Sequence, residues 1–385
     1  MKIMLVSPYD FTYPGGANNH IIHLAAEYRA GGHDVRILAP ASPGRPLPAV
    51  EGFRAMGTPV PIHSNGSTAR ITLSPTLSRQ VKRLLAEERP DVIHLHEPLM
   101  PTLPLTVLWQ AEARAVGTFH AFSESNLGYF YARPLLQRFF ERLDAKIAVS
   151  QPAADFVGRY FGGDYEIIPN GIEINQFGPS VRPLPQYRDG RPTILFVGRY
   201  NEPRKGFRYL LRAFALVRDQ FPEARLLVVG GGDPELYRED LHRLGSQGVE
   251  FAGYVETEQL PRYYVSCDLF CTPSIKGESF GIILLEAMAS GRAVVASRIP
   301  GHASVIDHGQ DGWLVAPQDP VALALALVRL LADRAKREEI ATAGLRKARS
   351  FAWSEVARRV LDVYRGQGEV VFAPPPSLGL PAGVP

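Results

Sequence analysis

Short runs of aliphatic and β-branched residues alternate with longer amphipathic segments in the first part of the chain. Residues 20–29 place Ile21, Ile22, Leu24 and Ala25 at helical spacing, which predicts a helix with one apolar face. Six apolar runs surround this segment and predict strands at residues 3–6, 35–38, 92–95, 115–119, 147–149 and 165–168. Such alternation is typical of βαβ units that build a parallel sheet.

A second series of the same kind begins after residue 190. Its apolar runs predict strands at residues 193–197, 226–229, 269–271 and 293–295, and helices near residues 209–221, 279–290 and 321–333. Residues 176–190, between the two series, are rich in proline with little apolar content, so they predict a linker. We therefore expect an α/β protein of two doubly wound, Rossmann-like domains, residues 1–175 and 191–352, facing a deep cleft.

Composition excludes several classes of protein. The 385 residues suffice for two cores, and a net charge of +3 is too small for a protein that coats nucleic acid. Two cysteines exclude a disulfide framework and favour a reducing compartment. The apolar run within residues 1–8 is too short for a signal peptide, and no apolar run is long enough to span a membrane, so we expect a cytoplasmic protein. The proline-rich residues 367–385 predict a disordered tail.

Three common phosphate-binding patterns are missing from the chain. Glu235 stands where the third glycine of a G-x-G-x-x-G dinucleotide fingerprint would follow Gly230 and Gly232, which argues against an oxidoreductase. No glycine precedes a lysine, so there is no Walker loop, and no D-x-D pair could hold a metal on a diphosphate. The pair His94-x-His96 before Glu97 is a possible metal-ligand pattern, but we interpret it as a strand end that lines the cleft.

Gly277-Glu278-Ser279-Phe280-Gly281 matches the G-x-S-x-G nucleophile elbow of the α/β hydrolases. An elbow needs a strand that runs directly into it, whereas residues 273–276 intervene here. The downstream acid and base would be Asp307 and His308, which are sequence neighbours and a poor geometry for a triad. A serine hydrolase that uses Ser279 therefore stays only as a remote alternative.

The same stretch fits an anion site better. Glu278 lies just before an apolar helix and Glu286 lies about two turns into it, so the amide groups of residues 279–282 are expected at a helix start. A strand ending at residue 197 leads into a loop with Arg199, Arg204 and Lys205. Gly15 and Gly16 open another helix after the first strand, where bare backbone can approach a phosphate. Together these features predict a diphosphate site that needs no metal.

In combination, these motifs resemble the retaining glycosyltransferases of the GT-B fold, family 4. The resemblance rests on Gly15-Gly16, Gly198-Arg199, the segment 202–206, and Glu278 through Glu286, and it covers residues 1–366. Within that family the chain is most similar to phosphatidylinositol mannosyltransferases, which move mannose from GDP-mannose onto inositol at a membrane surface. The segments that carry this likeness are residues 39–43, 65–70, 94–98 and 118–120.

The resemblance implies a role for each matching residue and implies no cofactor. It places His120 beside the transferred sugar as an essential residue, with Glu278, Arg199 and Lys205 as its catalytic partners. Glu278 would contact the sugar hydroxyls, and Glu286 the ribose. The implied donor-binding residues are Tyr9, Gly15, Gly16, Arg199, Arg204, Lys205, Val255, Glu278, Ser279, Phe280, Gly281, Ile282 and Glu286. The implied acceptor-binding residues are Asn18, Asn65, Ser67 and Arg70.

Two departures from the family pattern leave the substrates open. Ser64 stands where the family enzyme has an aromatic residue, and the loop of residues 253–258, expected to read the base, lacks a lysine. Alternatives are a hexosyltransferase that uses another sugar nucleotide and acts on a different lipid or a polysaccharide, and a sugar-nucleotide sensor without catalysis. The resemblance also implies that a helix near residues 353–366 crosses back onto the first domain.

A lipid acceptor requires contact with a bilayer. Residues 76–85 predict a helix whose face opposite its leucines carries Arg79, Lys82 and Arg83 as one basic stripe. The stripe matches the basic helix of the mannosyltransferases, so we expect peripheral binding to the anionic cytoplasmic face of the membrane. An ordinary surface helix whose leucines pack on the sheet would give the same pattern.

Overall fold

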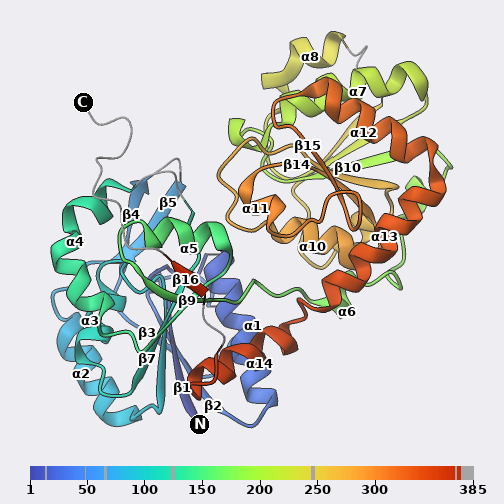
Figure 1. Ribbon diagram of the computed structural model, residues 1–385. Coiled ribbons are helices and arrows are strands. Elements are labelled where there is room, and N and C mark those ends of the chain that lie inside the picture. Colours follow the sequence, from blue (N-terminus) through green and yellow to red (C-terminus); the bar gives the residue numbers. More distant parts are fainter. Residues whose placement is uncertain are drawn as a thin grey trace. The chain divides into compact units, whose positions relative to one another are not determined.

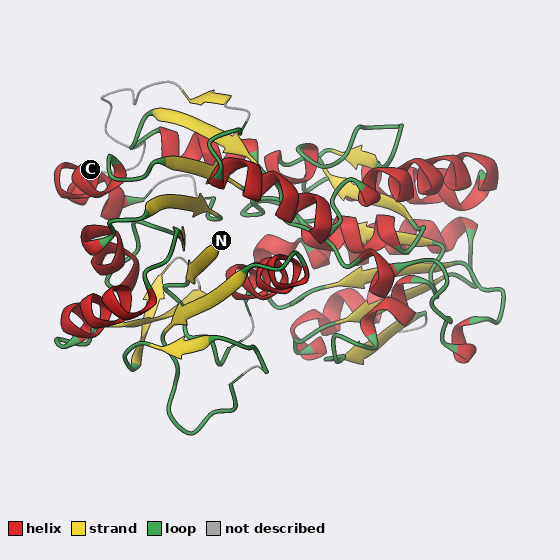
Figure 2. Ribbon diagram, turned by 90° about the horizontal axis from the view of Figure 1, so that it is seen from below, coloured by secondary structure: helices red, strands yellow, loops and turns green. Residues whose placement is uncertain are grey.

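The computed structural model describes residues 1–13, 15–47, 49–64, 67–122, 126–243, 248–368 and 371–373. The chain divides into two compact units, one formed by residues 1–170 and 353–385 and the other by residues 171–352. Each unit is an α/β layer structure in which helices lie on both sides of a sheet (Figures 1 and 2). The predicted pair of Rossmann-like, doubly wound domains is thus present as two separate sheets.

The first unit is built on an eight-stranded sheet in the order β16-β9-β8-β7-β6-β1-β2-β3. All neighbouring strands are parallel except β16, which pairs antiparallel with β9. Its strands are β1 (Lys2–Val6), β2 (Asp34–Ala39), β3 (Phe53–Ala55), β6 (Val92–His96), β7 (Arg114–Phe119), β8 (Ala145–Ala148), β9 (Gly163–Ile167) and β16 (Val371–Ala373). A separate hairpin consists of β4 (Pro59–Ser64) and β5 (Ser67–Thr72).

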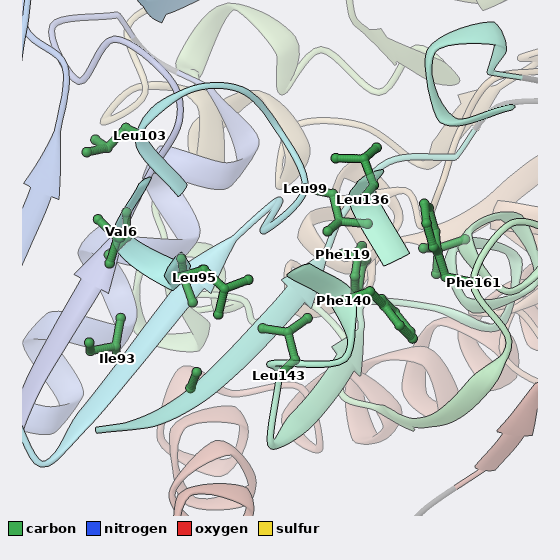
Figure 3. Packing of buried hydrophobic residues seen from close by; sticks show 14 of the residues in the cluster. Val6, Ile93, Leu95, Leu99, Leu103, Phe119, Leu136, Phe140, Leu143 and Phe161 are labelled. Atoms are coloured by element: carbon green, nitrogen blue, oxygen red, sulfur yellow. The ribbon is translucent and has the colours of Figure 1, made fainter. Parts of the chain in front are cut away.

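Helices cover both faces of this sheet because successive residues of a strand point to opposite sides. Ile3 and Leu5 pack with α1 and α14, whereas Met4 and Val6 pack with α2, α3, α4 and α5. Figure 3 shows part of the buried cluster that contains Val6, in which Phe119 at the end of β7 lies near Phe140 and Leu143. The helices are α1 (Gly16–Ala30), α2 (Leu77–Glu88), α3 (Leu103–Gln110), α4 (Leu127–Phe140), α5 (Gln151–Gly158) and α14 (Trp353–Tyr364).

The second unit has a six-stranded, wholly parallel sheet in the order β12-β11-β10-β13-β14-β15. Its strands are β10 (Thr193–Val197), β11 (Arg225–Val229), β12 (Val249–Gly253), β13 (Leu269–Thr272), β14 (Ala293–Ser297) and β15 (Trp313–Val315). Its helices are α6 (Ile174–Phe177), α7 (Phe207–Gln220), α8 (Arg238–Arg243), α9 (Leu260–Tyr264), α10 (Ile282–Ala289), α11 (Pro300–Ala303), α12 (Pro320–Ala332) and α13 (Arg334–Arg349). One buried cluster joins the sheet to α7 and α12, and another joins it to α9 and α10.

The observed units differ from the predicted division in two places. Residues 171–190, predicted as the end of the first domain and a linker, belong to the second unit: Phe177 packs on Tyr264, and the Leu184 amide donates to Ser266 Oγ at 2.8 Å. Part of the tail predicted to be disordered forms strand β16, because backbone groups of the β9 edge are free to pair with it. Residues 374–385 lie outside the described residues.

Candidate active site

Two loops of the second unit meet because the strands that precede them are neighbours. Strands β10 and β13 pair in parallel, so their carboxyl ends lie at the same edge of the sheet. The loops are joined by a hydrogen bond from the Ile275 amide to the Arg204 carbonyl at 2.8 Å. Gly206 permits this approach: it has a φ of 69°, and a Cβ atom there would lie 2.0 Å from the Pro273 carbonyl oxygen.

The meeting loops carry a compact cluster of charge. Lys205 Nζ lies 2.7 Å from Glu278 Oε1, and Arg204 Nη1 lies 3.0 Å from the same oxygen. Glu202 bridges the two arginines, with one oxygen 2.7 Å from Arg199 Nη2 and the other 2.7 Å from Arg204 Nη2. Three cations against two carboxylates leave net positive charge at this edge of the sheet. The three predicted diphosphate ligands and Glu278 are therefore brought together.

The cations also set the ionisation of Glu278. Burial acts to raise the pKa of this carboxyl, but the Lys205 ammonium and the Arg204 guanidinium lower it below its ordinary value. Glu278 therefore stays a carboxylate at neutral pH. A carboxylate held by two cations beside a loop can accept hydrogen bonds from sugar hydroxyl groups when a ligand displaces one of them.

Glu286 lies on α10 in a different environment. Its Oε2 accepts a hydrogen bond from the Tyr264 hydroxyl at 2.7 Å, and burial raises the pKa of Glu286 to about 7. Glu278 and Glu286 thus differ: Glu278 is a carboxylate paired with cations, whereas Glu286 has a pKa close to neutral pH.

We expect the pH dependence of stability to report on Glu286. Because its folded pKa of about 7 exceeds its ordinary value of 4.5, the folded state holds an extra proton in this range and loses stability as the pH rises from 4.5 through 7. The loss should be about 1–3 kcal/mol for a partly buried group. Urea unfolding at pH 5 and pH 8 should show it in the wild type and not in Glu286→Gln. Equal pH dependence of both proteins would contradict the assignment.

The start of α10 differs from the prediction. The helix begins at Ile282 and not at Ser279, because Gly281 has a φ of 99° and separates the loop from the helix. The amides of Ser279, Phe280 and Gly281 consequently belong to the loop before α10. The Phe280 side chain is only 3% exposed and packs in the buried cluster that joins the sheet to α9 and α10. Residues 273–278 separate Ser279 from the end of β13, so the strand-to-nucleophile turn of a serine hydrolase is not formed.

Val255, the residue predicted near the base, follows β12 and is partly buried against the α9–α10 cluster. Its neighbour Tyr254 is 73% exposed. The parallel strands β11 and β12 place this loop at the same sheet edge as the cation cluster, two strands from β10, which leads into the cationic loop.

In the first unit, Gly15 and Gly16 form the start of α1. A Cβ atom built on either glycine would meet no described atom within 4 Å, so packing within the protein does not require glycine at these positions. Their open surroundings are consistent with close approach of a ligand to the backbone. Tyr9, in the preceding loop, is partly buried, and burial together with Glu97 raises its pKa.

Asn18 was predicted to bind the acceptor, but in this structure it is 4% exposed and serves the loop before α1. Its Nδ2 donates to the carbonyls of Asp10 and Tyr13, and its Oδ1 accepts from Ser7 Oγ at 2.7 Å. These contacts hold the loop of residues 7–13, and the contact of Asn18 with the acceptor stays a prediction.

Arg70 on β5 contacts the same loop. Its guanidinium lies 3.9 Å from the centre of the Tyr13 ring, and that of Arg45 lies 4.0 Å from it. Neither arginine has an acidic partner among the residues that the structure describes. Asn65 lies outside the described residues, and for Ser67 only its backbone position in β5 is described.

His120 directly follows β7, and its ring contacts other imidazoles. Its Nε2 lies 2.9 Å from His96 Nδ1, and the His20 ring packs edge-on against it. Burial, together with His20 and His94, lowers the pKa of His120 well below its ordinary value, so the ring is neutral. His94 bonds to Tyr364 and Thr118, and no group of three His, Cys, Asp or Glu side chains in the described part of the chain could hold a metal ion.

The predicted basic stripe lies on α2, at the outside of the first unit (Figure 1). Leu77, Val81 and Leu84 are buried against the sheet, so the apolar face of the helix is occupied by the protein core. Arg79, Lys82 and Arg83 are exposed; Arg83 pairs with Glu87 at 2.6 Å. No helix among the described residues is long and apolar enough to cross a membrane.

Sequence reasoning missed three partners of the predicted residues. Glu202 pairs with two of the cations, Tyr264 bonds to Glu286, and Glu97 accepts hydrogen bonds from the backbone of His120. Only Glu202 carried a local signal, as an acid inside a cationic loop. The others come from elements distant in sequence, so their contacts depend on the folded sheet.

Comparison with known proteins shows that nearly the whole chain is similar to glycosyltransferases. The family described as Glycosyltransferase Family 4 matches residues 14–176, and Glycosyl transferases group 1 matches residues 191–333. The phosphatidyl-myo-inositol mannosyltransferase of Mycobacterium tuberculosis H37Rv is 40% identical over 369 residues, covering 94% of this chain and 96% of the relative. The protein of the same name from Propionibacterium freudenreichii is 35% identical over 377 residues, covering 96% of each chain.

Among solved structures, sucrose-phosphate synthase from Thermosynechococcus elongatus superposes with a TM-score of 0.72 at 26% identity, covering 95% of this chain and 98% of that one. The fold is that of the GT-B glycosyltransferases, and the protein is a glycosyltransferase. More particularly, the chain belongs to glycosyltransferase family 4, with mannosyltransferases of phosphatidyl-myo-inositol among its relatives.

Proposed function

We propose that this enzyme transfers mannose from GDP-mannose to the inositol ring of phosphatidylinositol, with retention of configuration and without a metal. The observation that carries the proposal is the cluster of Arg199, Arg204 and Lys205 around Glu278, in a chain similar over 94% of its length to phosphatidyl-myo-inositol mannosyltransferases. The cluster supplies the charge for a nucleoside diphosphate, and the relatives' names supply the sugar and the acceptor.

The reaction separates charge at the bond between the anomeric carbon and the phosphate. As this bond breaks, positive charge develops on the sugar and negative charge on the diphosphate. Lys205, Arg204 and Arg199 stabilise the negative charge, since they are already held in place by Glu278 and Glu202 before a ligand binds. Glu278 accepts hydrogen bonds from the hydroxyls of the transferred sugar, and Glu286 from the ribose.

Retention follows if the acceptor hydroxyl attacks from the face that the diphosphate leaves. The departing phosphate oxygen takes the proton of that hydroxyl, so no protein nucleophile is needed. His120 contributes a neutral imidazole beside the sugar, consistent with its lowered pKa. Arg70 and Arg45, which have no acidic partner in the described part of the chain, supply positive charge for the phosphate of the acceptor.

We expect activity to survive an excess of chelator. Three basic side chains take the place that a divalent cation holds on a diphosphate in other transferases, and the sequence contains no D-x-D pair. Transfer should be measured with EDTA and with added magnesium or manganese, and the rates should agree within about twofold. Loss of activity with EDTA that is restored by either metal would contradict metal independence.

The assignment of substrates is tested with a panel of sugar nucleotides and acceptors. We expect mannose transfer from GDP-mannose to phosphatidylinositol to exceed every other combination. Preferred use of a UDP-sugar or of a different lipid or polysaccharide would favour the alternative hexosyltransferase. Binding of a sugar nucleotide with neither transfer nor donor hydrolysis would indicate a sensor, and hydrolysis of esters that depends on Ser279 would indicate a hydrolase.

A lipid acceptor requires the enzyme to reach the cytoplasmic face of the membrane as a peripheral protein. The exposed cations Arg79, Lys82 and Arg83 on α2 support this contact, because basic side chains are attracted to anionic lipid. Since Leu77, Val81 and Leu84 are buried, the contact through α2 is electrostatic and is expected to weaken with salt.

A further inference from the structure

Within the His94-x-His96-Glu97 pattern, the side chain of His96 contacts the ring of His120. It is the last residue of β6, and β7 pairs with β6 so that His96 lies opposite Thr118, two residues before His120. The His96 and His120 rings are stacked with centroids 5.2 Å apart and an interplanar angle of 23°. The hydrogen bond between His96 Nδ1 and His120 Nε2 measures 2.9 Å.

Glu97 holds the backbone on which His120 is carried. Its Oε1 accepts hydrogen bonds from the amides of His120 and Ala121, both at 2.7 Å. The Glu97 amide in turn donates to the Thr118 carbonyl at 2.8 Å, and Glu97 keeps a φ of 51° to make these contacts. The ring and the backbone of His120 are thus held by two consecutive residues, His96 at the end of β6 and Glu97 directly after it, which leaves the ring little freedom to turn.

The hydrogen-bond partners of the two ring nitrogens of His96 indicate which nitrogen carries the proton. A neutral imidazole has one N–H group and one bare nitrogen. His96 is completely buried, and its Nε2 has no hydrogen-bond partner among the residues that the structure describes. Because a buried N–H without a partner is rarer than a buried acceptor without one, the proton belongs on Nδ1, where it is donated to His120.

The same bond then determines the form of His120. If His120 Nε2 accepts a proton from His96, the single proton of the neutral His120 ring lies on Nδ1. No described residue forms a hydrogen bond with His120 Nδ1. This N–H is therefore free to donate to a ligand, whereas the lone pair on Nε2 is already engaged and cannot remove a proton from the acceptor.

We propose that His96 is a positioning residue that fixes His120 as the Nδ1–H tautomer, so that His120 acts as a hydrogen-bond donor to substrate and not as a general base. The role at the sugar rests on the proposed function. The tautomer itself is a property of the protein without substrate, and the two are tested separately.

The tautomer is read by nitrogen NMR of the full-length protein labelled with 15N-histidine. The chain has ten histidines, and the His120 signals are assigned as those absent from His120→Gln. In the ligand-free wild type we expect His120 to be protonated at Nδ1 across pH 6–8. Protonation at Nε2 would overturn the proposal, and this result requires no variant of His96 to fold and no transfer assay to succeed.

Variants of His96 separate hydrogen bonding from packing. His96→Asn can place an amide N–H near the position of Nδ1 and should preserve the His120 tautomer, whereas His96→Phe keeps a ring without a donor and should lose it. His94→Phe is the matched control, because His94 lies on the same strand and is buried but bonds to Tyr364 and Thr118 instead. Because the His94 ring also stacks on His96, with centroids 4.4 Å apart, this variant should lower the thermal midpoint and shift the His120 signals slightly, but it should leave His120 protonated at Nδ1.

The same two His96 variants are tested by their kinetics. We expect His96→Phe to reduce kcat for transfer by about 10- to 100-fold with KM for donor changed little, and His96→Asn to restore most of kcat. Equal losses in both variants would show that His96 acts only through packing, and would overturn the positioning role. Absence of any transfer in the wild type, together with Nδ1 protonation, would reject the proposed function and leave the tautomer assignment intact.

Discussion

Replacing Lys205 or Arg199 by alanine is expected to lower transfer about 30- to 1000-fold, equivalent to roughly 2–4 kcal/mol of transition-state stabilisation. Each variant removes one positive charge from the cluster that faces the leaving diphosphate. The effect should be on kcat/KM, with Lys205→Ala the more severe of the two. Lys205 is 13% exposed and already docked on Glu278, whereas Arg199 is 69% exposed before ligand binds.

The control for these variants is Lys336→Ala, which removes a lysine from a surface pair with Glu339 on α13. It should leave kcat/KM within about twofold of the wild type, since surface pairs contribute little. Circular dichroism and thermal unfolding establish that all three proteins are folded. Near-normal turnover of both Lys205→Ala and Arg199→Ala would show that the diphosphate does not bind at this cluster.

Replacing Arg79, Lys82 and Arg83 together by serine is expected to weaken binding to phosphatidylinositol-containing anionic vesicles by roughly 100-fold. Each cation near an anionic surface contributes about 1 kcal/mol, so the three together contribute about 3 kcal/mol at moderate salt. Flotation or sedimentation with vesicles measures the loss. Transfer to lipid should fall with it, while donor hydrolysis in solution should be unchanged, because α2 carries no part of the cation cluster.

The matched control for this prediction replaces three exposed cations of α13, Arg334, Arg346 and Arg349, by serine. Net charge then changes by the same amount on the other unit. Vesicle binding should persist in the control. If it falls equally in both triple variants, overall charge and not the α2 stripe governs attraction to the membrane; if it falls in neither, α2 is not the membrane contact.

The sequence predicts the parallel strands and the cationic loop well, because both signals are local. A run such as residues 193–197 is apolar throughout since both faces of its strand are covered, and the observed β10 has the same bounds. Weaker patterns were missed. The β4–β5 hairpin joins short strands of mixed polarity, and β15 is only three residues long, so neither gives a periodic signal.

Site residues were predictable as far as they lie next to a strand end or a helix start. Lys205 and Glu278 follow neighbouring strands, so their meeting could be expected from the fold class. The environment of each side chain was not predictable. Asn18 stands near the two glycines in sequence, but its orientation toward Ser7 and Asp10 depends on how the loop of residues 7–13 folds over the sheet.

The return of α14 to the first unit has a consequence for synthesis of the chain. Trp353, Val356 and Val360 complete the cluster that covers Ile3 and Leu5, yet they are made after the whole of the second unit. One face of the first sheet is therefore covered by α1 but lacks the part of its cover that α14 supplies throughout most of translation, while residues 171–352 are contiguous and can finish folding in order. The domain that begins first is completed last, and its apolar face stays incomplete until the end of translation.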